Sequence, residues 1–303
     1  MLLGVVGFRV PGLTTHDLIA DQQWEAVVKS FPGARYRRIL VAAAAALALP
    51  LAALVAPASG AVAQAGGTAR TAAATASCPW LNQSLPVAQR VSMLMAQMTL
   101  ADKINMVTGA GTSEPYVFYI APIPSLCIPA IGEEDGPLGP GDGLAGVTQM
   151  PSAVSLAASF DTPLAYQYGQ VVGSEERAKG AMVDLGPTVN IDRDPRWGRS
   201  FETYTEDPYL NSALAVADID GVQSQDEMAQ IKHYAVYNQE TNRNTPADDA
   251  IVSTRALNEI YLPAFLAGTT QAHAASVMCS YSYINGQDAC QNQYLLQTTL
   301  DQN

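Results

Sequence analysis

Positive charge, histidine and cysteine are scarce in this 303-residue chain. The 16 Lys and Arg residues face 28 Asp and Glu residues, and the net charge is −12. A chain this acidic repels phosphate backbones and anionic lipid, which argues against a nucleic-acid partner. With three histidines, four cysteines and no Cys-x-x-Cys pair, the sequence also argues against a structural zinc site. We therefore expect neither a metal ion nor a nucleic acid.

One glycine pattern imitates a nucleotide-binding motif. Residues 141–146 satisfy Gly-x-Gly-x-x-Gly, but Pro137 and Pro140 precede the pattern and no strand leads into it. The strand–turn–helix context that cradles a dinucleotide is therefore missing. We expect no organic cofactor.

Long apolar runs are also rare, and the clearest one lies near the N-terminus. Residues 39–56 are almost wholly apolar, follow the basic cluster Arg35–Arg38 and precede Ala61-Val62-Ala63. This order is typical of a secretory signal, although the length of the run also suits a membrane anchor. Pro50 within the run and the small residues after it favour the signal. We expect a secreted, extracellular protein, cleaved after Ala63 and without a stable membrane anchor.

The signal divides the chain into segments. Residues 1–34 are an extension that fits no part of a signal, and residues 35–63 are the signal itself. Residues 64–77 are a linker of small residues and threonine, and residues 78–303 form the folded domain.

All four cysteines lie beyond the predicted signal, in a compartment where disulfide bonds form. The even count predicts two bonds. Cys279 and Cys290 flank an Asn-Gly turn that folds the chain back on itself, so we expect them to pair. Cys78 and Cys127 are then the second pair.

Short apolar runs alternate with longer segments of helical periodicity through the domain. This alternation predicts βαβ units and a parallel sheet. Five strands suit an α/β fold of the partial TIM type, since a complete (β/α) barrel has eight strands. The predicted strands are residues 128–131, 154–158, 181–185, 228–231 and 275–279. The predicted helices are residues 85–98, one that opens at Thr99, and residues 163–179, 207–223, 253–272 and 292–300.

Polar clusters follow four of these strands. Glu133–Asp135 comes after the first, residues 190–206 after the third, Lys232-His233 after the fourth and Ser280-Tyr281 after the fifth. In a (β/α) barrel, the loops at the carboxyl ends of the strands build the active site. We therefore expect one shared site.

The segment from Gly186 to Pro208 is the most distinctive part of the chain. It holds five acids, three arginines, a Trp and a Phe in a stretch too irregular for one helix or strand. Together with Lys232-His233-Tyr234 and Val277–Tyr281, it resembles the N-terminal domain of family 3 glycoside hydrolases, the β-glucosidase group. The resemblance runs from about Cys78 to the last residue and implies a partial (β/α) barrel.

The resemblance implies that four charged or polar residues bind the glycone, which is the sugar at the non-reducing side of the cleaved bond. Asp135 is implied to accept hydrogen bonds from sugar hydroxyls, and Arg199 to grip adjacent hydroxyls. Lys232 and His233 match paired donors to two vicinal hydroxyls. A general-acid role for His233 is less favoured, because no histidine follows in residues 234–243.

Two further residues complete the implied site. Met278 is implied to wall the pocket, although a buried Met at a strand end needs no such role, and the Tyr281 hydroxyl to bond the nucleophilic carboxylate. Many relatives have an Arg where this chain has Pro140, which changes the entrance of the site. We interpret Arg193 and Arg196 as partners of the acids in their own loop.

The resemblance implies an exo-acting, retaining β-glycosidase without a cofactor, and Asp135 is the glucosidase-like residue at its position. Retaining hydrolysis needs two carboxyl groups about 5 Å apart. Resemblance places both beyond Asn303, so residues 64–303 alone are expected to bind a β-linked glucoside or oligosaccharide without hydrolysing it. The alternatives are a non-catalytic or degenerate carbohydrate-binding protein, and β-xylosidase or arabinosidase specificity.

Cleavage of the signal has a direct test. N-terminal sequencing of the exported protein should begin at or near Gln64, because the cleavage site follows Ala63. A mature chain that retains Arg35–Arg38 would contradict the predicted signal.

Overall fold

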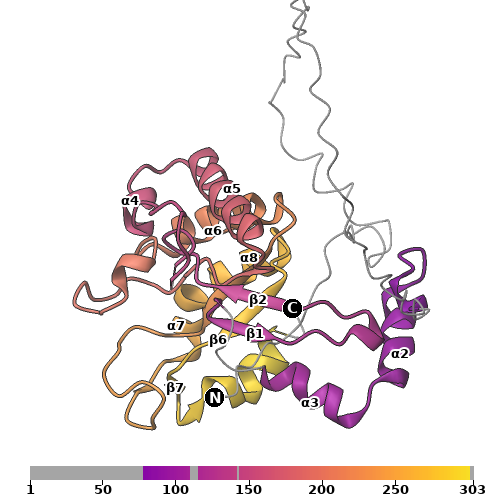
Figure 1. Cartoon of the computed structure of the whole chain (residues 1–303). Coiled ribbons are helices and arrows are strands. Elements are labelled where there is room, and N and C mark those ends of the chain that lie inside the picture. Colours follow the sequence, from indigo (N-terminus) through magenta and orange to yellow (C-terminus); the bar gives the residue numbers. More distant parts are fainter. Residues whose placement is uncertain (1–77, 110–114, 142, 301–303) are drawn as a thin grey trace, which may run out of the picture. The chain divides into compact units, whose positions relative to one another are not determined.

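The computed structural model describes residues 78–109, 115–141 and 143–300, shown as coloured ribbon in Figure 1. The predicted extension, signal and linker, residues 1–77, lie outside the described residues. A five-stranded sheet in the order β1-β2-β3-β4-β6 forms the centre, with β1 antiparallel to β2 and the other pairs parallel. Its strands are β1 Phe118–Ile120, β2 Ile131–Glu134, β3 Val183–Asp184, β4 Met228–Tyr234 and β6 Ser276–Cys279.

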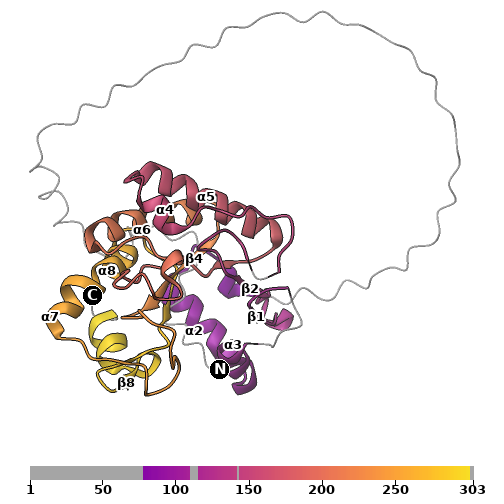
Figure 2. The ribbon, with the colours of Figure 1, turned by 90° about the vertical axis from the view of Figure 1, so that its left-hand side faces the viewer.

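Helices α4, α5, α6 and α8 lie on one side of this sheet (Figures 1 and 2). The chain passes from β2 through α4 and α5 to β3, through α6 to β4, and through α7 and α8 to β6. Parallel strands joined by helices on one face form a partial (β/α) barrel, as predicted. The helices are α2 Val87–Gln97, α3 Leu100–Thr108, α4 Ala153–Ala157, α5 Thr162–Lys179, α6 Pro208–Gln223, α7 Thr254–Ala256 and α8 Pro263–Thr270.

Short polar caps explain where the helices begin. Asp161 accepts a hydrogen bond from Leu164 at the start of α5, and Asp207 caps α6 in the same way. Thr99 and Asp102 form the capping box that the sequence predicts for α3.

The predicted helix at residues 253–272 is divided. A π-helix, η5 Leu257–Tyr261, separates α7 from α8, and Pro263 starts α8 because it has no backbone N–H to continue the preceding turn. The predicted helix at 292–300 is also a π-helix, η7 Tyr294–Leu300. The described residues contain no helix long and apolar enough to cross a membrane.

Glycines let α5 and α6 approach each other closely. A Cβ atom at Gly169 would lie 2.2 Å from the backbone oxygen of Asp218, and one at Gly221 would lie 2.2 Å from that of Tyr166. Both separations are far inside van der Waals contact, so any larger residue would push the helices apart. The main core lies between these helices and the sheet, with Leu214 and Ile219 fully buried.

The predicted strand at residues 154–158 is wrong, because this segment is helix α4. Its buried residues Ala153, Leu156 and Ala157 recur at helical spacing rather than at the alternate positions of a half-buried strand. A five-residue apolar run does not distinguish the two by periodicity alone. The fifth strand is β1 instead.

The bounds of β2 and β4 differ most from the prediction. β2 begins at Ile131, three residues later than expected, so Glu133 and Glu134 lie within the strand and only Asp135 follows it. β4 continues to Tyr234, so Lys232 and His233 lie within the end of the strand and not at the start of a loop. Both strands are buried along their whole length, polar residues included. An apolar run in the sequence therefore marks only part of each strand.

Both predicted disulfide bonds are present, Cys78–Cys127 and Cys279–Cys290. The Asn285-Gly286 turn joins β7 Tyr283–Ile284 to β8 Gln287–Asp288, and both turn residues have positive φ, 52° and 84°. Asn-Gly is the residue pair that such a hairpin favours. β7 also pairs with β5 Asp249–Ala250, in a separate three-stranded sheet.

Buried carboxyl groups make stability depend on pH. Burial raises the pKa of Glu133 to about 7, and raises that of Asp218 to about 7 against the hydrogen bond from Tyr204. Burial and the neighbouring Asp184 raise the pKa of Glu227 to about 8. Raised carboxyl pKa values mean that the folded chain binds more protons than the unfolded chain, so stability falls as pH rises towards these values. Buried His233, whose pKa is lowered, opposes this trend only below about pH 6.5.

We therefore expect the melting temperature to fall between about pH 6.5 and 8. Glu227→Gln should flatten this slope, because each such carboxyl contributes at most about 1.4 kcal/mol of lost stability per pH unit. Glu259→Gln is the matched control, since the Glu259 side chain is 59% exposed and pairs with Arg255 at the surface. Thermal melts of the three proteins across this range measure the effect. A melting temperature that stays level or rises with pH would contradict it.

Candidate functional site

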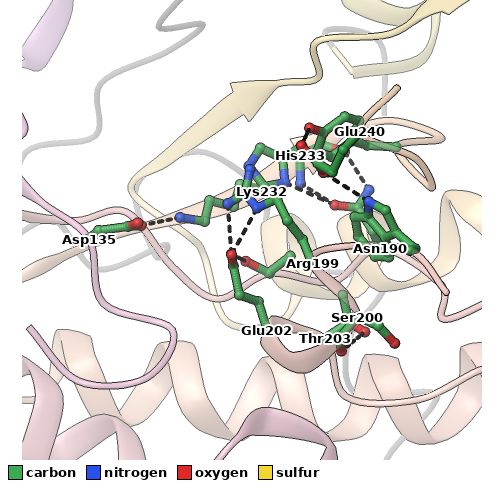
Figure 3. A network of polar contacts seen from close by, with 12 residues as sticks. Asp135, Asn190, Arg199, Ser200, Glu202, Thr203, Lys232, His233 and Glu240 are labelled. Atoms are coloured by element: carbon green, nitrogen blue, oxygen red, sulfur yellow. Dashed lines mark hydrogen bonds and ion pairs between the residues drawn. The ribbon is translucent and has the colours of Figure 1, made fainter. Parts of the chain in front are cut away.

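A buried ion pair joins β4 to the loop after β2. The Lys232 side chain is 2% exposed, and its Nζ donates to Oδ1 of Asp135, whose side chain is 35% exposed (Figure 3). Asp135 directly follows β2, so the two residues meet at the carboxyl ends of parallel strands. The ammonium is therefore almost wholly removed from solvent, while more of the carboxylate stays accessible. A buried Lys is tolerated only with such a partner.

A second ion pair lies in the loop after β3. Arg199 donates from Nε to Oε1 of Glu202 at 2.8 Å and from Nη2 to Oε2 at 2.7 Å, which is a bidentate pair. Glu202 lies in a short 3₁₀ helix, η4 Ser200–Glu202, within the polar segment that the sequence marks as irregular. Burial opposes the charge of Arg199, but the hydrogen bonds and charge of Glu202 outweigh it and raise the pKa of Arg199.

Asn190 makes three polar contacts with His233. Asn190 Oδ1 lies 3.0 Å from the backbone N of His233 and 3.0 Å from the ring Nδ1, and Asn190 Nδ2 donates to the His233 carbonyl at 2.8 Å. Burial lowers the pKa of His233 well below its usual value, and the nearby charges of Arg199 and Lys232 add to this shift. The ring is therefore neutral at physiological pH, which does not suit a general acid.

Aromatic rings line the same region. The Tyr237 ring lies 5.1 Å from the ring of His233 and 5.5 Å from that of Tyr281, which follows β6. The guanidinium of Arg199 stands 5.7 Å from the Tyr237 ring, and that of Arg243 4.9 Å from the Tyr281 ring. These contacts join the loops after β3, β4 and β6.

Glu240 holds this aromatic group together. Its carboxylate accepts hydrogen bonds from Trp197 Nε1 at 2.9 Å, from the Tyr237 hydroxyl at 2.7 Å and from Arg243 Nη1 at 3.0 Å. Trp197 belongs to the loop after β3, and the other two donors belong to the loop after β4. One carboxylate thus fixes two loops relative to each other.

A cavity of about 240 Å³ opens beside the ion pairs. Asp135 and Glu202 line it, together with the exposed Phe201 and with Pro140, the residue that departs from the family pattern. Two carboxylates and an aromatic ring in one concave surface are typical of a small polar ligand site.

The charges of this site cancel. Lys232 and Arg199 are balanced by Asp135 and Glu202, so the site offers many hydrogen-bonding groups without net charge. Such an arrangement suits a neutral ligand with several hydroxyl groups. Within the described ranges, no group of three or more His, Cys, Asp or Glu side chains is placed to hold a metal ion.

The structure brings together five of the six predicted sugar-binding residues: Asp135, Arg199, Lys232, His233 and Tyr281. Met278 is buried in an apolar cluster with Ile131 and Val183, and its role at the pocket wall stays a prediction. The roles of all six toward a sugar are expectations from the resemblance.

One predicted loop contact differs. Arg196 pairs with Asp194, as expected, but Arg193 donates to the Tyr261 hydroxyl at 2.9 Å and stands over its ring. Tyr261 comes from the π-helix η5, a neighbour that proximity in sequence does not reveal.

The sequence analysis placed Asn190 at the start of a polar cluster of the shared site, but it gave neither Asn190 nor Glu240 a role there. Asn190 interrupts the apolar run Val189–Ile191, and a buried amide in such a run is the signal that would have found it. Glu240 lies beyond the Lys232-His233 motif and has no comparable signal.

A larger cavity, of about 550 Å³, is lined by Arg193, Asn238, Asp248 and Tyr261 among others, and by none of the six predicted residues. We place the site at the smaller cavity because the buried ion pairs converge there.

The fold and these motifs have clear relatives among known proteins. The family described as glycosyl hydrolase family 3 N terminal domain matches residues 118–303. Thermostable beta-glucosidase B of Acetivibrio thermocellus is 37% identical over 225 residues, which cover 71% of this chain and 29% of that protein. The beta-glucosidase of Rhizobium radiobacter is 39% identical over 212 residues, which cover 68% of this chain and 25% of that protein.

Solved structures agree. Beta-glucosidase 3B from Thermotoga neapolitana, in complex with α-D-glucose, matches with a TM-score of 0.66 and 35% identity over 71% of this chain and 32% of that one. DesR, a beta-glucosidase from Streptomyces venezuelae in complex with D-glucose, matches with a TM-score of 0.64 and 41% identity over 69% of this chain and 27% of that one. The chain spans less than a third of the length of each of these four relatives. The chain belongs to glycoside hydrolase family 3, and its residues 118–303 match the N-terminal domain of that family.

Proposed function

We propose that this chain supplies the glycone-binding site of an exo-acting, retaining β-glucosidase. The observation that carries the proposal is the buried Lys232–Asp135 pair beside the bidentate Arg199–Glu202 pair, at a cavity open to solvent. The Thermotoga and Streptomyces relatives were solved in complex with glucose, which supports glucose as the ligand of this chain by analogy.

The acids of this site act as hydrogen-bond acceptors rather than as nucleophiles. Asp135, Glu202 and Glu240 are each engaged by a cation, Lys232, Arg199 and Arg243 in turn. A carboxylate held in a charge-assisted pair is a poorer nucleophile, but it orients sugar hydroxyls well. The proposed role of these residues is to bind and orient the glycone, so that the reacting carbon is held in place during cleavage.

Glucose is favoured over a pentose by Asp135, whose carboxylate reaches the cavity and matches the glucosidase-like pattern. β-Xylosidase or arabinosidase specificity remains the alternative substrate class. The alternative function is that of a non-catalytic carbohydrate-binding protein.

We further propose that the protein is secreted and retains no membrane anchor. The basic, apolar and small-residue segments of the N-terminal region support this proposal, as do the two disulfide bonds, which persist in oxidising compartments. The acidic net charge of −12 supports a neutral substrate rather than a nucleic-acid partner.

Asp135→Asn tests the glycone site. The amide keeps the shape of the side chain but leaves the buried Lys232 ammonium without a counter-charge and weakens acceptance of sugar hydroxyls. We expect glucose to bind roughly 30-fold or more weakly, as for a lost charged partner worth about 2 kcal/mol or more. Isothermal titration calorimetry with glucose measures the effect.

Asp194→Asn is the matched control, because Asp194 pairs with Arg196, whose side chain is 88% exposed, outside the cavity. It should bind glucose like the unmodified chain, and thermal melts should show that both variants are folded. Equal glucose affinity in all three proteins would place the sugar elsewhere.

Hydrolysis separates the candidate functions. The native protein, purified from its source, should cleave an aryl β-glucoside faster than the matching β-xyloside or arabinoside, and the activity should follow the protein through purification. Faster cleavage of the xyloside or arabinoside would favour the pentose alternative. Glucose binding without cleavage of any of these substrates would favour the non-catalytic alternative.

A further inference from the structure

The contact between Asn190 and His233 restricts where the histidine ring carries its hydrogen. Both residues are buried, with exposed fractions of 3% and 1%. Asn190 is oriented by the backbone of His233 itself: its Nδ2 donates to the carbonyl oxygen at 2.8 Å, and its Oδ1 accepts from the backbone N–H at 3.0 Å. Rotating the amide by 180° would set two donors against each other and two acceptors against each other. The oxygen of Asn190 is therefore fixed in place.

The fixed oxygen determines the tautomer of the ring. Asn190 Oδ1 lies 3.0 Å from Nδ1 of His233, and an amide oxygen only accepts hydrogen bonds. Nδ1 must therefore carry a hydrogen. Burial and the charges of Arg199, Lys232 and Arg243 lower the pKa of His233, so the ring is neutral and has only this one N–H. Nε2 is left with a lone pair.

Nε2 faces no protein partner. Among the residues that the structure describes, none forms a hydrogen bond with it, and it is not one of the polar atoms that are sealed from solvent without a partner. The rings of Tyr237 and Tyr281 flank the histidine at 5.1 Å and 6.0 Å between ring centroids. The small exposed part of His233 therefore includes an unused acceptor.

We propose that Asn190 is a positioning residue that makes Nε2 of His233 a hydrogen-bond acceptor, so that the glycone must present a free, neutral hydroxyl group to it. This proposal rests on the proposed function of the site, and it changes the expected role of His233. The sequence analysis paired His233 with Lys232 as two donors. The geometry assigns Lys232 as the donor and His233 as the acceptor, which gives two neighbouring hydroxyls opposite hydrogen-bond directions.

The consequence is a selection among sugars. A methyl ether, a fluorine, a sulfate or a phosphate at this position has no hydrogen to donate, and an anionic group would also meet the lone pair of Nε2. A free hydroxyl can donate its hydrogen to Nε2, so it fits beside His233. The site should therefore bind sugars modified at this hydroxyl more weakly than the unmodified sugar.

Nitrogen-15 NMR of the histidine rings tests the tautomer in the unmodified chain, without any activity. The chain has only three histidines, so a His233→Asn variant identifies the His233 signals. We expect Nδ1 to be protonated and Nε2 unprotonated across neutral pH. A protonated Nε2 in the unmodified chain would overturn the proposal.

Asn190→Asp tests the control by Asn190. A carboxylate against Nδ1 favours the imidazolium, which places a second hydrogen on Nε2. We expect an Nε2–H signal to appear at neutral pH and the affinity for glucose to fall by about tenfold or more, as for one lost hydrogen bond. Asn211→Asp makes the same change at a buried amide that donates to the Val189 carbonyl and, within the described residues, forms no hydrogen bond with a histidine. Asn211→Asp should leave the His233 signals unchanged. If the His233 signals are the same in Asn190→Asp as in Asn211→Asp, the role of Asn190 is contradicted.

Glucose analogues test the selection. Calorimetry compares glucose with its deoxy, fluoro and O-methyl forms at each hydroxyl. At one hydroxyl, each of the three changes should weaken binding by about tenfold or more, because each removes the only donor to Nε2. A fluoro form that keeps most of its affinity at every position would overturn the selection. If no form of glucose binds while Nδ1 is protonated, the proposed function fails although the tautomer is as inferred.

Discussion

A buried cation requires a counter-charge, and this requirement shapes the site. Lys232 is almost completely removed from solvent, and Asp135 is its partner across the gap between β4 and the loop after β2. Transferring an unpaired ammonium into a protein interior costs several kcal/mol, so the contact between the two segments stabilises the folded chain. Because the strands are parallel, their carboxyl ends lie at one edge of the sheet, and the same edge receives the Arg199–Glu202 pair from the loop after β3.

The remaining contacts hold these charges in position. Asn190 grips the backbone of His233 next to Lys232, and Glu240 fastens the loops after β3 and β4 through three donors. The result is a preorganised surface with balanced charge, which suits a neutral polyhydroxyl ligand better than an anion. The relatives in glycoside hydrolase family 3, some of them solved with glucose, are consistent with this chemistry.

Much of the fold and most of the candidate site could be predicted from the sequence, because both depend on local patterns. The helices α5 and α6 are long and begin at capping residues, and Lys232-His233 and Arg199 lie in motifs whose order is distinctive. The Cys279–Cys290 bond followed from a turn signal between its two residues.

What the sequence did not reveal depends on contacts between distant segments. Residues 153–157 are too short for their period to separate helix from strand, and β2 conceals Glu133 and Glu134 inside a fully buried strand. Arg193 meets a tyrosine 68 positions away rather than the acids beside it. Asn190 matters because of its contact with His233, which is 43 positions away and is set by the pairing of segments along β4.

A crystal structure of this chain with glucose is the most direct measurement of the central claim. The account predicts one glucose molecule in the cavity beside Asp135 and Glu202, with one hydroxyl at Nζ of Lys232 and a neighbouring hydroxyl at Nε2 of His233. Glucose bound only in the larger cavity lined by Arg193 and Tyr261, with the ion pairs untouched, would contradict it.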